Sequence, residues 1–291
     1  MYERVDGSVS APGPMRDLVV KEIQCKSILT RSGIEGVDYA INPYVGCAHG
    51  CAYCYAVFMK RFTGHTEEWG TFVDVKVNAA QVLSRQLKRT NPGNITFGTV
   101  TDAYLPLEAE YGITRECLEV LLDYHFPISI LTKSDLVLRD LDLIKMLKDA
   151  EVAFTINTLD EEVRRRFEPG APPIAARLQA LRSLSDAGIS TWAFCGPVLP
   201  SITDDESSLD NLFAELKRAG VGYVLVDSLN LRGAVMGRLT RVLREHYPDL
   251  VEVYRDLSAN RLPYHQALMD RTRRIAERHD LPWRGVDLGP G

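Results

Sequence analysis

The sequence of residues 39–55 is YAINPYVGCAHGCAYCY, and this stretch decides the fold. Residues 39–44 are predicted to form a strand. Three cysteines follow within eight positions, Cys47, Cys51 and Cys54, in a loop that begins where this strand ends. In parallel α/β folds, ligands bind at the carboxyl ends of the strands and in the loops that follow them. The stretch therefore predicts a ligand site at the carboxyl edge of a sheet.

Apolar runs alternate with amphipathic stretches on the C-terminal side of this loop. The predicted strands are residues 39–44, 95–101, 128–132, 152–156, 191–195 and 223–227. The predicted helices are residues 79–88, 114–124, 140–149, 175–187, 209–219 and 234–245. Strand followed by helix, repeated in this way, predicts a parallel sheet with helices on its outer face. Because these units are too few for a closed eight-stranded barrel, we expect an α/β fold with a partial (βα)6 TIM-like barrel and an open sheet.

Cap residues and flanking segments set the expected boundaries. Gly188 is expected to end the helix before it, Asn78 to cap one helix, and Ser207 or Ser208 to cap another. We expect an N-terminal extension over residues 1–34, a core domain over 35–247 and a C-terminal helical cap over 248–291. The cap contains one helical stretch near residues 264–279.

Composition limits the class of protein. The chain has 291 residues, of which 45% are apolar, enough to bury a substantial core. The chain has 34 basic and 39 acidic residues. This balance excludes an overall polycation but does not exclude a local basic groove. Residues 1–14 lack the pattern of a signal peptide, and no apolar run approaches the ~18–20 residues that a membrane helix needs. We therefore expect a cytoplasmic protein without a membrane partner.

The spacing of the three cysteines indicates an iron–sulfur cluster. Gaps of three and two residues let one short loop place three thiolates at three corners of a cubane, and Gly46 and Gly50 permit the turns. Clusters of the ferredoxin type have four cysteine ligands, so a three-cysteine loop leaves one iron open to a substrate or cofactor. The main alternative is a structural zinc site, which takes four protein ligands and would need His49 inside the turn.

This cysteine pattern after the first strand of a six-unit βα chain resembles the radical S-adenosylmethionine superfamily. The resemblance implies a [4Fe–4S] cluster whose open iron is chelated by the amino and carboxylate groups of S-adenosylmethionine. It also implies reductive cleavage of that cofactor to a 5′-deoxyadenosyl radical, which abstracts hydrogen from an organic substrate that the sequence does not identify. A reductase, ferredoxin or flavodoxin is then expected as electron donor. In such cofactor-driven chemistry, the protein orients the cofactor and the substrate and excludes side reactions.

Residues at the other strand ends narrow the resemblance to the spore photoproduct lyase branch, over about residues 39–230. That branch implies contacts to the bound S-adenosylmethionine. Tyr53 is expected near the adenosine, and Thr101 and Asp102 near the methionine amino group. Lys133, with Ser134, is expected at the methionine carboxylate, because a compact ammonium suits an anionic group. For Asp102 the alternative is a cap on the following segment.

The same resemblance extends to the fourth and fifth strand ends. It makes Asn157 and Thr158 candidates for ribose or methionine contacts. Gly196 to Val198 could present backbone to the adenine, where Gly196 allows a close approach. Arg177 could pair with Glu168 on the protein surface. Such an exposed pair contributes little to stability.

The hydrogen donor of the resembled lyase is a cysteine near the end of the second strand, where this chain has Thr99, Val100 and Thr101. Cys195 is the candidate replacement, expected to face the same cavity, and its alternative role is a small buried hydrophobic residue. The expectation of a nucleic-acid substrate, such as a DNA photolesion, rests only on the analogy with this lyase.

Two other classes of protein stay open. One is a non-catalytic iron–sulfur protein for electron transfer, and the other is a zinc-stabilised binding module. A reducible cluster whose spectrum ignores S-adenosylmethionine would favour the first. Zinc without acid-labile sulfide would favour the second.

Overall fold

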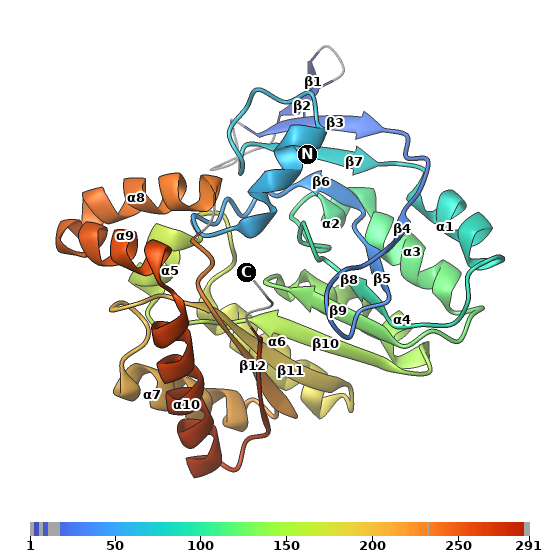
Figure 1. Cartoon of the computed structure of the whole chain (residues 1–291). Coiled ribbons are helices and arrows are strands. Elements are labelled where there is room, and N and C mark those ends of the chain that lie inside the picture. The colour runs from blue at the N-terminus through green and yellow to red at the C-terminus, as the bar shows by residue number, and fades with distance from the viewer. Residues whose placement is uncertain (1–2, 6–7, 11–17, 232, 288–291) are drawn as a thin grey trace. The chain divides into compact units, whose positions relative to one another are not determined.

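A computed structural model of the chain describes residues 3–5, 8–10, 18–231 and 233–287 (Figure 1). Part of the predicted N-terminal extension, residues 1–2, 6–7 and 11–17, lies outside the described residues, as do residues 288–291 of the predicted cap. The chain divides into two compact units. Unit 1 comprises residues 1–50 and 56–152, and unit 2 comprises residues 51–55 and 153–291.

Unit 1 contains a five-stranded sheet that includes the strand before the cysteines. Its order is β1 (Glu3–Val5), β2 (Ser8–Ser10), β3 (Val19–Ile23), β7 (Phe72–Lys76) and β6 (Tyr44–Gly46). β3 pairs with β7 in parallel, whereas β6 pairs with β7 antiparallel. Residues 19–23 of the predicted extension thus form a paired strand of this sheet.

The second sheet carries the predicted βα units. Its order is β13 (Trp283–Gly285), β12 (Tyr223–Ser228), β11 (Ser190–Val198), β10 (Ala150–Thr155), β9 (Ile128–Thr132), β8 (Ile95–Phe97), β5 (Tyr39–Ile41) and β4 (Leu29–Arg31). β5, β8 and β9 pair in parallel, as do β11, β12 and β13, and β4 adds antiparallel to β5. Among the described strands, β4 and β13 stand at the two ends of this order, so the sheet is open. The predicted fold class is confirmed.

Helices alternate with these strands along the chain. Unit 1 has α1 (Ala79–Leu87), α2 (Glu108–Tyr111), α3 (Ile113–Leu121), α4 (Leu141–Met146) and the 3-10 segment η3 (Asp135–Asp140). Another 3-10 segment, η2 (Tyr55–Phe62), follows the cysteine loop. Unit 2 has α5 (Glu161–Phe167), α6 (Ile174–Asp186), α7 (Glu206–Arg218), α8 (Ala234–His246), η4 (Pro248–Leu250), α9 (Val251–Ala259) and α10 (Leu262–Arg278). In Figure 1, α1 and α3 lie side by side beside β5 and β8, and α10 lies along β12 and α7. None of the helices in the described ranges has the length and apolarity to cross a membrane.

The first predicted strand is divided in two, which corrects its expected course. β5 ends at Ile41 and β6 begins at Tyr44 in the other sheet. Pro43 lies between them and cannot donate a backbone hydrogen bond to a strand ladder. The cysteine loop therefore follows β6, an antiparallel strand, and not a strand of the parallel sheet.

The predicted helix caps have mixed outcomes. Gly188 has φ of 81° just beyond α6, as expected for a glycine that ends a helix. The side chain of Asn78 makes no cap bond and instead accepts from the backbone N of Cys25 at 2.8 Å, so that prediction is wrong. Asp205, not a serine, caps α7 by accepting from Ser208 N at 2.9 Å, because the helix begins one turn earlier than predicted.

Candidate active site

The Cys47 half of the cysteine loop is built in unit 1. β6 leads into it, and Thr101 Oγ1 donates to the carbonyl of Gly46 at 2.6 Å, directly before Cys47. The backbone then turns, with Gly50 N donating to Cys47 O at 3.4 Å. Gly46 and Gly50 have φ of 86° and 61°, values that L side chains rarely adopt. The glycines in this loop thus have the turning function expected from the sequence.

Asp102 is the centre of a buried hydrogen-bond network beside this half of the loop. Its Oδ1 accepts from Thr132 Oγ1 at 2.6 Å and from Tyr104 N at 2.8 Å, while its Oδ2 accepts from Lys133 N at 2.8 Å. His49 Nδ1 lies 3.5 Å from Oδ2. Asp102 is 6% exposed, and most of the hydrogen-bonding capacity of its carboxylate is taken up by other groups of the protein. The bond from Tyr104 N is the one expected if Asp102 caps the segment that follows it.

Four predicted site residues meet in this network. Thr101 and Asp102 follow β8, and Lys133 and Ser134 follow β9. Ser134 N donates to Thr132 Oγ1 at 2.9 Å, and Ser134 Oγ caps η3 by accepting from Leu136 N at 3.3 Å. The ends of two neighbouring parallel strands are thereby fixed against each other and against the cysteine loop.

The Cys51 and Cys54 half of the loop belongs to unit 2. Ala52 N donates to Phe167 O at 2.8 Å, which ties the loop to the end of α5. Cys54 N donates to Cys51 O at 3.2 Å, and Arg238 Nη2 of α8 donates to the same carbonyl at 3.3 Å. The backbone between the last two cysteines is thus held from two helices.

A buried ion pair lies beneath this half. Tyr53 OH donates to Glu168, and Glu168 pairs with Arg177 of α6. Glu168 and Arg177 are each 1% exposed, so the surface pair considered for them is wrong. Arg177 also donates to the carbonyls of Thr155 and Pro172, each at 3.0 Å. Burial, followed by the neighbouring Glu168 charge, holds the pKa of Tyr53 well above its usual value.

The fourth and fifth strand ends come together with Tyr53. Asn157 Nδ2 donates to Pro197 O at 3.1 Å and lies 3.4 Å from Tyr53 OH. Thr158 is 9% exposed, and its Oγ1 accepts from the N of Asp160 at 3.0 Å in a local turn.

At the end of β11 two further predicted residues are packed within unit 2. A Cβ on Gly196 would lie 2.4 Å from the ring of Phe194, so a side chain there would require this ring to move. Val198 is 0% exposed. Their predicted contacts to adenine remain predictions.

Cys195 lies in β11, in register with Val226 on β12. It is 0% exposed, as expected for its alternative role as a small buried hydrophobic residue. Burial raises the pKa of its thiol strongly. The hydrogen-donor role of Cys195 stays an untested prediction.

The donor set of the loop fits an iron–sulfur cluster. The three thiols are free of disulfides, Cys47 and Cys51 are 8% and 6% exposed, and Cys54 is partly exposed. The other cysteines are Cys25, Cys117 and Cys195, none of which is in the loop. Within the described ranges, no three His, Cys, Asp or Glu side chains are grouped as around a single metal ion.

Sequence reasoning missed two residues at this edge of unit 2. Asp227, near the end of β12, is half-buried, and burial raises its pKa to about 6. An acid at the carboxyl end of a predicted strand was available as a clue. Arg238 gave no clue, because its contact to the cysteine loop spans 187 residues.

Comparisons with known proteins agree with this arrangement. Residues 41–212 match the family model of the Radical SAM superfamily. An uncharacterised protein of Methanocaldococcus jannaschii is 33% identical over 82% of this chain and 87% of its own length. The Radical SAM Nalpha-GlyT isomerase of Pseudomonas phage M6 is 27% identical, over 64% of this chain and 38% of that protein. Spore photoproduct lyase complexed with dinucleoside spore photoproduct has a similar fold, with a TM-score of 0.70, 19% identity and coverage of 91% of this chain and 81% of that one.

Proposed function

Because this chain belongs to the Radical SAM superfamily, we propose that it holds a [4Fe–4S] cluster on Cys47, Cys51 and Cys54 and cleaves S-adenosylmethionine reductively. The observation that carries this proposal is a loop with three thiols and no fourth, turned by glycines at Gly46 and Gly50. Three thiolates leave one iron of a cubane for the cofactor. A cluster held by Cys47, Cys51 and Cys54 would supply the one electron needed for reductive cleavage of S-adenosylmethionine, and with it the radical chemistry for hydrogen abstraction from a substrate.

The residues of unit 1 would orient the methionine end of the cofactor. Lys133 follows β9 and is the proposed partner of its carboxylate, because a compact cation suits an anionic group. Asp102 is assigned a positioning role, since its oxygens already accept from Thr132, Tyr104 and the backbone of Lys133. It would therefore act through Lys133 and not by contact with the cofactor.

The residues of unit 2 would hold the second part of the loop and the nucleoside end of the cofactor. Tyr53, fixed by Glu168, sets the backbone between Cys51 and Cys54. Asn157 is the proposed contact to ribose or methionine from the same unit. A buried, fully bonded arrangement of this kind keeps its geometry without reorganisation when the cofactor binds.

Production of 5′-deoxyadenosine tests the proposal. The chain would be reconstituted with iron and sulfide without oxygen, reduced with dithionite and supplied with S-adenosylmethionine. We expect 5′-deoxyadenosine from the wild type and from the matched control Cys25→Ala, and none from Cys47→Ala, Cys51→Ala or Cys54→Ala. A cluster-loaded wild type that forms no product would contradict the proposal. A cluster spectrum unchanged by S-adenosylmethionine would then favour an electron-transfer protein, and zinc without sulfide a binding module.

A dinucleoside is the substrate class to test first, because the fold is similar to that of a lyase complexed with one. The chain has Thr99, Val100 and Thr101 where the resembled lyase has its cysteine, so we do not extend the proposal to the same repair reaction. The substrate assay would compare a lesion-bearing dinucleoside, a peptide and a metabolite pool, each deuterated. Transfer of deuterium into 5′-deoxyadenosine from one of them would identify the class.

A further inference from the structure

A buried histidine in unit 1, outside the site described above, lies between two carboxylates. His65 Nδ1 is 2.9 Å from Glu67 Oε2, and His65 Nε2 is 2.8 Å from Asp74 Oδ1. His65 is 8% exposed. A neutral imidazole has one N–H and can donate to only one of these oxygens, whereas an imidazolium donates to both. The geometry therefore fits the charged ring, with two charge-assisted hydrogen bonds.

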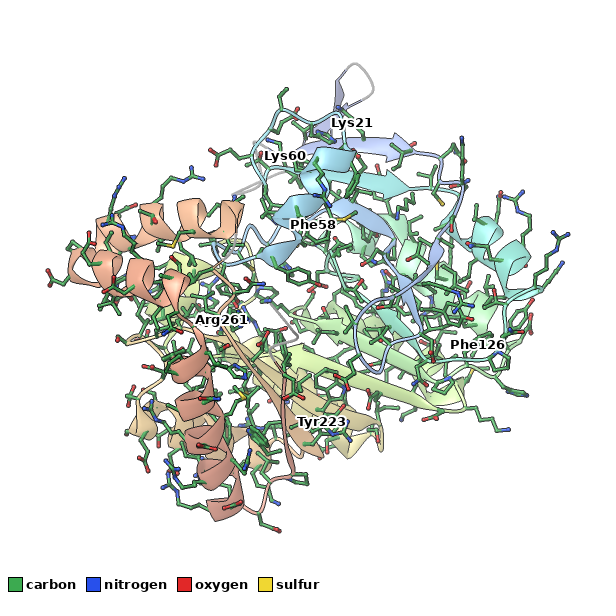
Figure 2. All side chains as sticks on the ribbon, in the orientation of Figure 1. Lys21, Phe58, Lys60, Phe126, Tyr223 and Arg261 are labelled. Carbon is green, nitrogen blue, oxygen red and sulfur yellow. The ribbon has the colours of Figure 1, made fainter. Side chains whose placement is uncertain are left out.

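The charged groups around His65 come from three segments. Glu67 lies on the loop that carries the histidine, and Asp74 lies on β7. Lys21 on β3, labelled in Figure 2, is in register with Asp74 and also acts on Glu67. The pKa of Glu67 is lowered, first by a backbone hydrogen bond and then by the hydrogen bond from His65. The Glu67 carboxylate is thus placed to keep its charge beside the ring.

The His65 ring also supports an aromatic layer. It stacks on Phe72, with ring centroids 4.0 Å apart and planes inclined by 16°. Trp69 meets Phe72 edge-on, with ring centroids 5.8 Å apart. Phe72 and Trp69 are 0% and 3% exposed. We call residues 65–72 the buttress, because the cysteine loop rests on them.

The buttress contacts the cysteine loop at its glycines. A Cβ on Gly46 would lie 2.3 Å from Phe72 O, and a Cβ on Gly70 would lie 2.7 Å from the Cα of Gly50. No side chain fits between the two segments at either point. The turns on both sides of Cys47 are therefore shaped by the buttress, and a shift of Phe72 or Gly70 would move them.

We propose that His65 is a positioning residue: bound through both ring nitrogens to Glu67 and Asp74, it locks the buttress against residues 46–50 and thereby supports retention of the cluster. The cluster part rests on the proposed function. A side chain that cannot bond both carboxylates and stack on Phe72 would loosen the buttress, and the Cys47 part of the loop would loosen with it.

Hydrogen exchange of the apo chain tests the clamp without any cluster. The variant is His65→Gln, which lacks the ring that bonds both carboxylates and stacks on Phe72, and the matched control is His125→Gln, at an exposed histidine of the same unit. At pH 6.5 we expect amides of residues 44–50 to exchange about tenfold faster in His65→Gln than in the wild type, which corresponds to about 1.4 kcal/mol. His125→Gln should match the wild type. Equal protection of residues 44–50 in all three proteins would overturn the proposal, whether or not the chain binds a cluster.

The rate of cluster loss tests the cluster part of the proposal. Iron release to a chelator would be followed without oxygen on the reconstituted full chain. We expect release from His65→Gln to be about tenfold faster than from the wild type, and release from His125→Gln to match the wild type. Equal release from all three proteins would contradict the clamp. If the wild type binds no cluster, the proposed function is wrong, and the exchange experiment still decides the role of His65.

Discussion

Replacing Arg177 with leucine tests the buried support of the cysteine loop. The substitution keeps an apolar stem and removes the cation that pairs with Glu168 at 1% exposure. Breaking a buried ion pair from one side costs about 3–5 kcal/mol, because the remaining charge stays buried without its partner. The carbonyls of Thr155 and Pro172 also lose donors at 3.0 Å. Against a total stability of about 5–15 kcal/mol, the loss is large.

The assay is urea unfolding of the reduced apo chain, with Arg182→Leu as matched control. Arg182 lies on the same helix, α6, but its side chain is 40% exposed and pairs with Glu215 at 3.1 Å. We expect the control to change the free energy of unfolding by less than about 0.5 kcal/mol. Adding Glu168→Gln to Arg177→Leu should restore about 1–3 kcal/mol, because the uncompensated charge is then gone. If Arg177→Leu costs no more than Arg182→Leu, the ion pair does not support the loop.

Three further predictions concern both units. Gly70→Ala should destabilise the chain by about 1–3 kcal/mol and lower the iron content after reconstitution, because Gly70 has φ of 110° and its Cβ would meet the Cα of Gly50. The control Gly64→Ala, which has open space around it, should change neither quantity. Equal iron content in the two variants would contradict this prediction. Thr101→Val should cost about 1–2 kcal/mol in urea unfolding, because a buried carbonyl loses its donor; an unchanged midpoint would count against that bond. Asp227→Asn should stabilise the chain by up to about 3 kcal/mol at pH 8 and not at pH 4. Its pKa is raised to about 6 from 3.8, so the wild type loses stability as pH rises through 6, and a gain independent of pH would refute this.

The order of the elements could be predicted because each strand is an apolar run with polar neighbours. Residues 128–132 were predicted as a strand and form β9 with the same bounds. The first strand was misjudged because an apolar stretch on both sides of Pro43 does not reveal that the chain changes sheets there. Helix starts were misplaced where several residues in a row can cap, as before α7.

The site could be predicted only where its chemistry is local in sequence. The three thiols lie in one loop and carry their own spacing. The partners of Arg177 are 5, 9 and 22 residues away, so its burial could not be inferred from composition. The approach of Gly70 to Gly50 and the pairing of Cys195 with Val226 depend on packing between distant segments. Such features come from the fold and not from a motif.

The most direct measurement of the central claim is electron–nuclear double resonance on the reduced, anaerobically reconstituted chain. S-adenosylmethionine would carry nitrogen-15 in its amino group and oxygen-17 in its carboxylate. The account predicts hyperfine coupling of both labels to the cluster, because one iron lacks a protein ligand and binds the cofactor. A fully loaded cluster that shows no coupling to either label, with all four irons ligated by side chains, would contradict it.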